Sequence, residues 1–206
     1  IINSVPETKL EKYLDGIKDK DLLLSKLSFS NTRKQFDRVF YSILGLEDGQ
    51  IGFGVMDKDV MAFVSDCKEL NEDTIENANR LVAQLNLICE DDTIPVNYIS
   101  CNARAIKFLL LLMSLDLVDF LQDKKRKLKA LDAINKKLSA FSSAKADSVS
   151  ETFHGYSDPV IEEYRLLALI SKGGHSLKRV QNRMEILAYY VNDFSNQTKP
   201  SGIQPI

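Results

Sequence analysis

The sequence predicts an all-α protein, and three observations support this. The 206 residues include only nine Gly and five Pro and no Trp, so few residues would interrupt helices. Apolar residues recur at spacings of three and four along most of the chain, which is the period of an amphipathic helix. Residues 102–145 contain neither Gly nor Pro. An apolar content of 44% with 27% charged residues is ordinary for a globular domain and too apolar for a disordered chain.

The first half of the chain is typical of short helices joined by turns. Pro6 opens the first predicted helix, and Asn31 is the expected N-cap of the second. Asp73 is the expected N-cap of the last, with Glu76 three residues on in a variant of the capping box. These helices cover residues 6–17, 31–44, 58–70 and 73–88, with a Gly-rich turn before the third.

One long helix is predicted over about residues 102–142, the longest in the molecule. Its first half is apolar nearly all round, so it must be buried on several sides. Its second half narrows to one apolar line, which we call the stripe, and this pattern predicts a helix that leaves a core and continues as half of a coiled coil. The stripe consists of Leu128, Leu131, Ile134, Leu138 and Phe141.

The last predicted helix has an apolar line with spacings of 3, 4, 3, 4 and 3, which we call the seam. A helix over residues 160–171 comes before it, and Ser176 is its expected cap. A seam this narrow is typical of a coiled coil. A short tether joins it to the stripe, so we expect the two to pair antiparallel within one chain. The seam consists of Leu177, Val180, Met184, Leu187, Val191 and Phe194.

The predicted helices and the polar segments between them divide the chain into three parts. Residues 1–92 form a helical N-terminal subdomain, and a polar segment with Pro95 separates it from the long-helix domain over residues 102–196. Residues 197–206 are expected to be a flexible tail.

No motif in the sequence indicates catalysis, a metal or an organic cofactor, so we expect none of them. The two histidines lie in turn-like segments without a second ligand at metal-binding spacing. The three cysteines, Cys67, Cys89 and Cys101, are odd in number and form no CxxC, so buried reduced thiols are expected. The formal net charge of −2 gives no general attraction to nucleic acid, and none is expected to bind.

The basic run "KKRKLK" at residues 124–129 lies within the predicted long helix. Aspartates interleave the basic residues around it, so a solvated helix face is a better interpretation than a nucleic-acid site. Lys124, Lys125 and Lys127 are therefore a possible docking face for a protein partner.

Three stretches together resemble the needle-tip and filament proteins of type III secretion, the hydrophilic translocators that include the V antigens. They are "FLLLLMSLDLVDFLQDKKRKLKALDAINKKLSAFSS", "HGYSDPVIEEYRLL" and "LKRVQNRMEILAYYVNDFSNQ", and the resemblance covers roughly residues 102–196. It implies a non-enzymatic protein, secreted or on the bacterial cell surface. Its implied partners are needle or translocator subunits or further copies of itself, with possible contact to a host membrane.

Two other functions fit the same patterns. A helical pore-forming toxin component would also have a long helix with a concentrated apolar segment, here residues 105–121. A helical effector or adaptor domain could assemble a site from the N-terminal half. Liposome leakage by the purified protein would favour the toxin, and binding to needle subunits without leakage would favour the tip protein.

Overall fold

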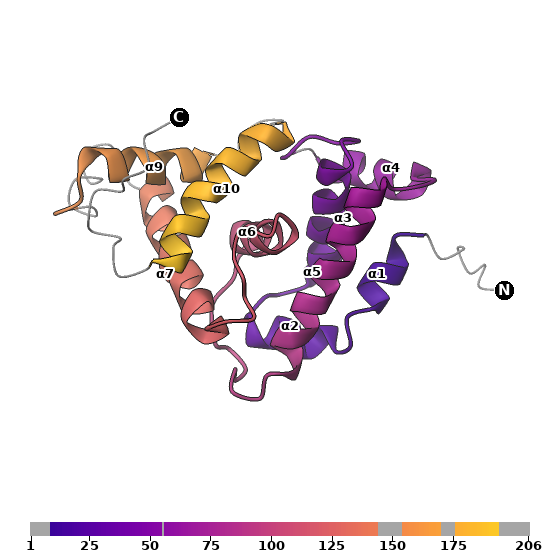
Figure 1. Ribbon diagram of the computed structural model, residues 1–206, viewed down its shortest axis with the longest axis horizontal. Helices are drawn as coiled ribbons and strands as arrows, with labels where there is room; N and C mark the ends of the chain where they lie inside the picture. The colour runs from indigo at the N-terminus through magenta and orange to yellow at the C-terminus, as the bar shows by residue number, and fades with distance from the viewer. Residues whose placement is uncertain (1–8, 55, 144–153, 170–175, 194–206) are drawn as a thin grey trace.

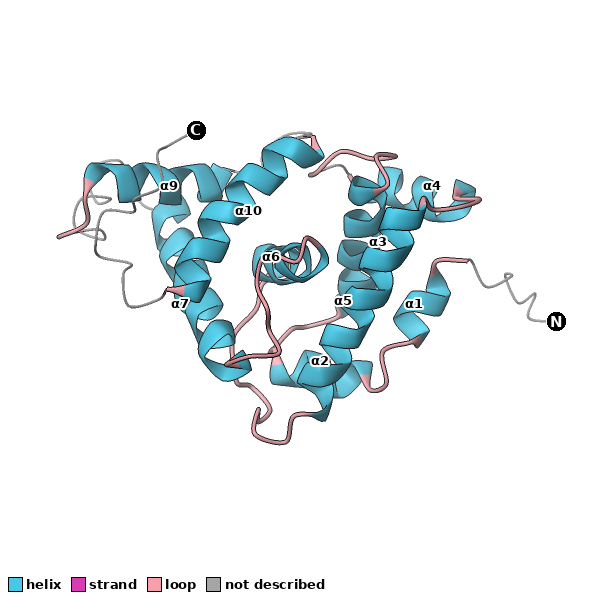
Figure 2. Ribbon diagram, in the orientation of Figure 1, coloured by secondary structure: helices cyan, strands magenta, loops and turns pink. Residues whose placement is uncertain are grey.

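The computed structural model describes residues 9–54, 56–143, 154–169 and 176–193, and it confirms the all-α prediction. Within these ranges the chain forms helices and loops without a β-strand (Figure 2). The helices of the first half are α1 (Glu11–Asp15), α2 (Lys20–Lys26), the 3-10 helix η1 (Thr32–Lys34), α3 (Gln35–Glu47), α4 (Asp57–Asp66) and α5 (Glu72–Glu90). Those of the second half are α6 (Ala103–Ser114), α7 (Lys124–Ser143), α9 (Asp158–Leu169) and α10 (Leu177–Asn192).

Helix α6 is the centre of the fold. Figure 1 shows it end-on, between α3 and α5 on one side and α7 and α10 on the other, and it packs against all four. Every residue from Phe108 to Ser114 is buried. An apolar surface on all sides of a helix requires neighbours on all sides, so the prediction that this segment is buried on several sides is confirmed.

Side-chain caps fix where several helices begin. The Asn102 side chain accepts a hydrogen bond from the Ala105 N–H and so starts α6. Asn71 does the same for Thr74 at the start of α5. The predicted N-cap Asp73 is wrong, because it lies inside the first turn of α5. There its negative charge interacts favourably with the positive end of the helix dipole, but its side chain is not the N-cap.

The single long helix predicted over residues 102–142 is wrong. Helix α6 ends at Ser114, α7 begins at Lys124, and the segment between them is not helical. Asp116 has a φ of 54°, and its N–H and that of Leu117 donate to the carbonyls of Met113 and Leu112. This pair of bonds is a Schellman motif with Asp116 in the left-handed position that Gly usually occupies. Asp tolerates this conformation better than most residues, so a helix can end here without Gly or Pro.

Helices α7 and α10 pack against each other, and α9 packs against both. The Arg126 guanidinium donates to the Asn192 carbonyl at 2.9 Å, so the start of α7 lies beside the end of α10. The two helices therefore run antiparallel where they meet. Because α9 and α6 also contact α7, its apolar side chains are shared among several neighbours. The predicted two-helix coiled coil stays a prediction.

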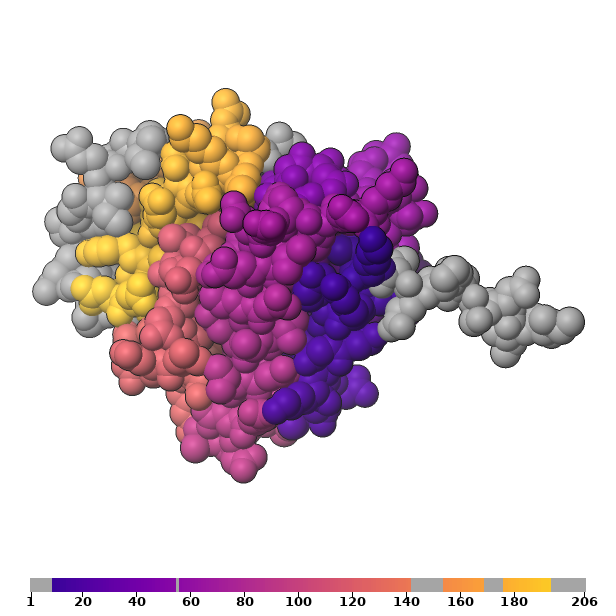
Figure 3. All heavy atoms as spheres, turned by 45° about the vertical axis from the view of Figure 1, so that its right-hand side comes forward, coloured from indigo at the N-terminus to yellow at the C-terminus, as the bar shows by residue number. Residues whose placement is uncertain are grey.

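One cluster of buried apolar residues includes side chains from helices α2 to α10. In the space-filling view, the indigo-to-magenta N-terminal helices and the orange-to-yellow C-terminal helices join in a continuous surface (Figure 3). The predicted division into residues 1–92 and 102–196 stays a prediction, and α6 contacts helices of both parts. Among the described residues, no helix combines the length and the hydropathy needed to cross a membrane.

Candidate functional site

The seam and the stripe lie inside the molecule. Leu128, Leu131, Ile134 and Leu138 are fully buried, and Phe141 is partly buried against the core. On α10, Val180, Met184, Leu187 and Val191 are fully buried and Leu177 is partly buried. Phe194, predicted to end the seam, lies outside the described residues. The seam is therefore covered by helices of the same chain, and its role in assembly stays a prediction.

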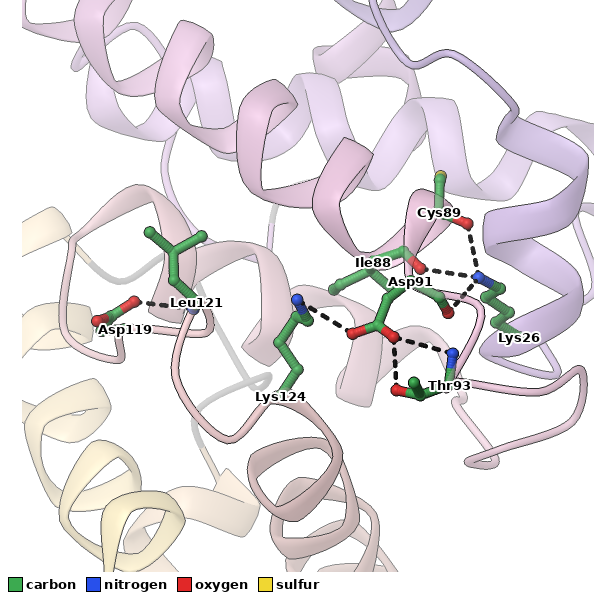
Figure 4. Close-up of polar contacts among 8 residues, drawn as sticks. All are labelled: Lys26, Ile88, Cys89, Asp91, Thr93, Asp119, Leu121 and Lys124. Carbon is green, nitrogen blue, oxygen red and sulfur yellow. Dashed lines mark hydrogen bonds and ion pairs between the residues drawn. The ribbon is translucent and has the colours of Figure 1, made fainter.

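The three lysines of the predicted docking face have different surroundings. The Lys124 ammonium forms an ion pair with Asp91, at an N–O distance of 3.0 Å (Figure 4). Lys127 is buried, and its ammonium donates to the Asp119 carbonyl. Lys125 alone of the three is exposed, without a polar partner for its ammonium in the described part of the chain. The expectation that all three lie on a solvated face is wrong, because Lys127 is buried against the loop at residues 115–123 and Lys124 pairs with Asp91 at the end of α5.

A polar cluster that the sequence did not indicate lies at the end of α5. The buried Lys26 ammonium of α2 donates to the carbonyls of Ile88, Cys89 and Asp91, at 3.0, 2.6 and 3.0 Å (Figure 4). The last carbonyls of a helix have no partner within the helix. Lys26 satisfies three of them at the negative end of α5, where a cation is also favoured by the helix dipole.

Asp91 connects this cluster to α7. Its side chain accepts hydrogen bonds from the Thr93 hydroxyl and N–H and pairs with Lys124 (Figure 4). These bonds lower the pKa of Asp91 to about 2. Every described polar group in the cluster has a partner, so we interpret the cluster as a set of structural contacts that hold α2, α5 and α7 together.

The predicted reduced thiols are free, and two of the three are buried. Cys89 and Cys101 are buried, whereas Cys67 is partly exposed. Burial raises the pKa of Cys101 to about 12, so its thiol is protonated at neutral pH. His154 is exposed, and His175 lies outside the described residues. No group of three or more His, Cys, Asp or Glu side chains that could hold a metal ion occurs within the described ranges.

A basic pocket lies between η1, α3, α4 and α6. We call it the α3–α6 pocket, and its volume is about 390 Å³. Arg33 lines it from the 3-10 helix η1, Arg38 from the first turn of α3 and Lys107 from α6, and Asp57 is the one acidic side chain among the described lining residues. Three cations against one carboxylate give the lining a net charge of about +2, although the whole chain carries −2.

No pattern in the sequence indicated this pocket. Arg33 and Lys107 are 74 positions apart, and each occupies an ordinary polar position in a different predicted helix. Only the packing of α6 beside α3 brings them to one cavity.

A scan against protein-family models, a search of curated proteins and a search of solved structures each found no match to this chain. The functional argument therefore rests on the residues and their arrangement.

Proposed function

We propose that the chain is a non-enzymatic assembly protein that binds other protein subunits through its outer surface. The particular form that we propose is a component of the type III secretion needle tip or of a related filament. It would dock on needle subunits and support delivery of proteins into host cells. The protein would then act outside the bacterial cell or on its surface.

The observation that most supports this proposal is the antiparallel contact of α7 and α10. The resemblance to needle-tip proteins implies a C-terminal helix that returns along an earlier one. Here Arg126 at the start of α7 bonds to Asn192 at the end of α10, and four seam residues are fully buried. A covered seam leaves the outer faces of this pair as the surface available to a partner.

Lys125 is the residue of the predicted docking face that suits this role. Its ammonium is exposed on the first turn of α7 and has no described partner. An exposed charge of this kind changes association with a charged partner more than it changes folding stability.

The proposal is tested by sedimenting the purified chain with purified needle filaments. We expect the chain to sediment with the filaments, and we expect Lys125→Glu to weaken this binding. Lys58→Glu is the matched control, because Lys58 is an exposed lysine on α4, a different part of the surface. Thermal melts of both variants would verify that each still folds.

Two results would contradict the proposal. One is an absence of co-sedimentation at salt concentrations that preserve surface electrostatics. The other is release of dye from liposomes by the chain alone, which would favour the pore-forming alternative. The second result would require α6 to leave its site between four helices, where Ile106 and Phe108 to Met113 are fully buried.

A further inference from the structure

The Lys107 ammonium lies in the α3–α6 pocket without a hydrogen bond or ion pair to any described residue. Its closest described interaction is with the face of the Phe53 ring, 5.2 Å from ammonium nitrogen to ring centroid. Burial lowers the pKa of Lys107, and the Asp57 carboxylate raises it only in part. Desolvating a cation that has no hydrogen bond or ion pair costs free energy. A bound anion would offset this cost and favour the charged form of Lys107.

Two arginines add to the positive charge around Lys107. Arg38 is partly held by Asp57, at an N–O distance of 2.5 Å, and four of its five N–H donors remain for other partners. Arg33 is exposed at the edge of the pocket and has no polar partner among the described residues. A guanidinium presents parallel N–H donors that match two oxygens of a phosphate.

The other walls indicate what else the ligand contains. Gln35, Val39 and Ser42 follow one another along a single face of α3, and Ala103 lies one turn before Lys107 on α6. The small Ala103 side chain leaves space next to the ammonium. Val39 and Val60, both largely buried, provide apolar contact in the lining. The volume of about 390 Å³ falls within the usual range of roughly 300–1,000 Å³ for small-molecule sites.

We propose that the α3–α6 pocket binds the phosphate monoester of a small organic molecule. The phosphate lies against Lys107, Arg38 and Arg33, and its two negative charges match the net charge of the lining. The organic part lies along Val39 and Val60. This proposal is independent of the assembly function, because no residue of α7 or α10 lines the pocket.

The test compares three probes by calorimetry and thermal shift: phenyl phosphate, its uncharged counterpart phenol, and inorganic phosphate. We expect phenyl phosphate to bind and to raise the melting temperature in proportion to its occupancy. Phenol should not bind, and inorganic phosphate should bind more weakly than the ester. Added NaCl should weaken the binding of both anions.

Two variants locate the site. Lys107→Met keeps the length of the side chain, and we expect it to weaken phenyl phosphate binding about tenfold or more, because it removes a charge-assisted hydrogen bond. Arg33→Gln should weaken binding several-fold and should fold normally, because Arg33 is exposed. Lys178→Met removes an exposed lysine on α10, outside the pocket, and should leave binding unchanged.

Three results would overturn the proposal. The first is no binding of either anion at about 10 mM, a concentration that would detect even millimolar affinity. The second is binding that neither Lys107→Met nor Arg33→Gln reduces. The third is equal binding of inorganic phosphate and the ester, which would assign the pocket to the bare anion.

Discussion

At the scale of single residues, the Glu47 carboxylate is buried near the end of α3, and neither of its oxygens has a hydrogen-bond partner among the described residues. Burial raises the pKa of Glu47 above its ordinary value of 4.5, and the nearby polar groups of Ser114, Arg80 and Asn77 oppose this rise in part. The folded protein therefore holds this proton to a higher pH than the unfolded chain does.

The sign of the pH effect follows from this difference. With a raised pKa in the folded state, Glu47 contributes stability below pH 4.5, and that contribution is lost as the pH rises through the raised value. Asp91 acts in the opposite direction and at lower pH. Its pKa is lowered to about 2, so its contribution is lost as the pH falls from its ordinary value of 3.8 toward 2.

We predict that Glu47→Gln raises the free energy of unfolding at pH 7 by on the order of 1 kcal/mol, because it removes an unsatisfied buried charge. The gain should shrink as the pH is lowered through the raised pKa of Glu47. Urea unfolding at a series of pH values measures both effects. Glu76→Gln on the exposed face of α5 is the control and should change little. A loss of stability in Glu47→Gln at pH 7 would show that the carboxylate is well paired.

At the scale of elements, Asp116 decides whether α6 and α7 are one helix or two. In the Schellman motif its φ is 54°, a conformation in which Gly carries no steric penalty. We predict that Asp116→Gly raises the free energy of unfolding by a few tenths to about 1 kcal/mol. In a continuous helix the same change would instead lower the free energy of unfolding by a few tenths of a kcal/mol, because Gly is a poorer helix former than Asp.

The sign of the Asp116→Gly effect in urea unfolding therefore distinguishes the two arrangements. Glu185→Gly provides the comparison, because Glu185 is exposed in the middle of α10 and the change should lower the free energy of unfolding by about 0.5 kcal/mol there. If Asp116→Gly also lowered the free energy of unfolding, Asp116 would lie within a helix.

At the scale of the whole molecule, one buried cluster reaches from α2 to α10 through α6. Leu187 on α10 is fully buried in it. We predict that Leu187→Asp lowers the free energy of unfolding by about 3–5 kcal/mol, because it leaves a cavity and buries an unpaired charge. Leu121→Asp should cost little, because the Leu121 side chain is 55% exposed.

The same variant tests whether the two parts of the chain unfold together. Cys89 is buried at the end of α5, far in sequence from Leu187, and burial raises the pKa of its thiol. In one cooperative unit, Leu187→Asp should increase the rate at which a thiol reagent modifies Cys89, as measured by peptide mass spectrometry. An unchanged rate in a destabilised variant would show that residues 1–92 unfold separately from residues 102–196.

The helical class, the buried faces of most helices and the central position of the apolar segment could all be predicted from the sequence. These features follow from local periodicity, because the apolar face of a helix has to pack against other parts of the protein. Phe108 to Met113 are buried in this way. Periodicity says nothing about a helix end that lacks Gly and Pro. The end of α6 at Ser114 depends on two backbone hydrogen bonds and on the tolerance of Asp116 for a left-handed conformation.

Which charged residues contact one another depends on how the helices pack. Lys26 caps α5 from α2, Lys127 is buried by the loop before α7, and Arg33 reaches the pocket that contains Lys107. Each is an ordinary polar position in its own segment, and its partners lie on other segments. A charged side chain acquires its role from the groups that surround it after packing, and this information is not present in the local pattern of the chain.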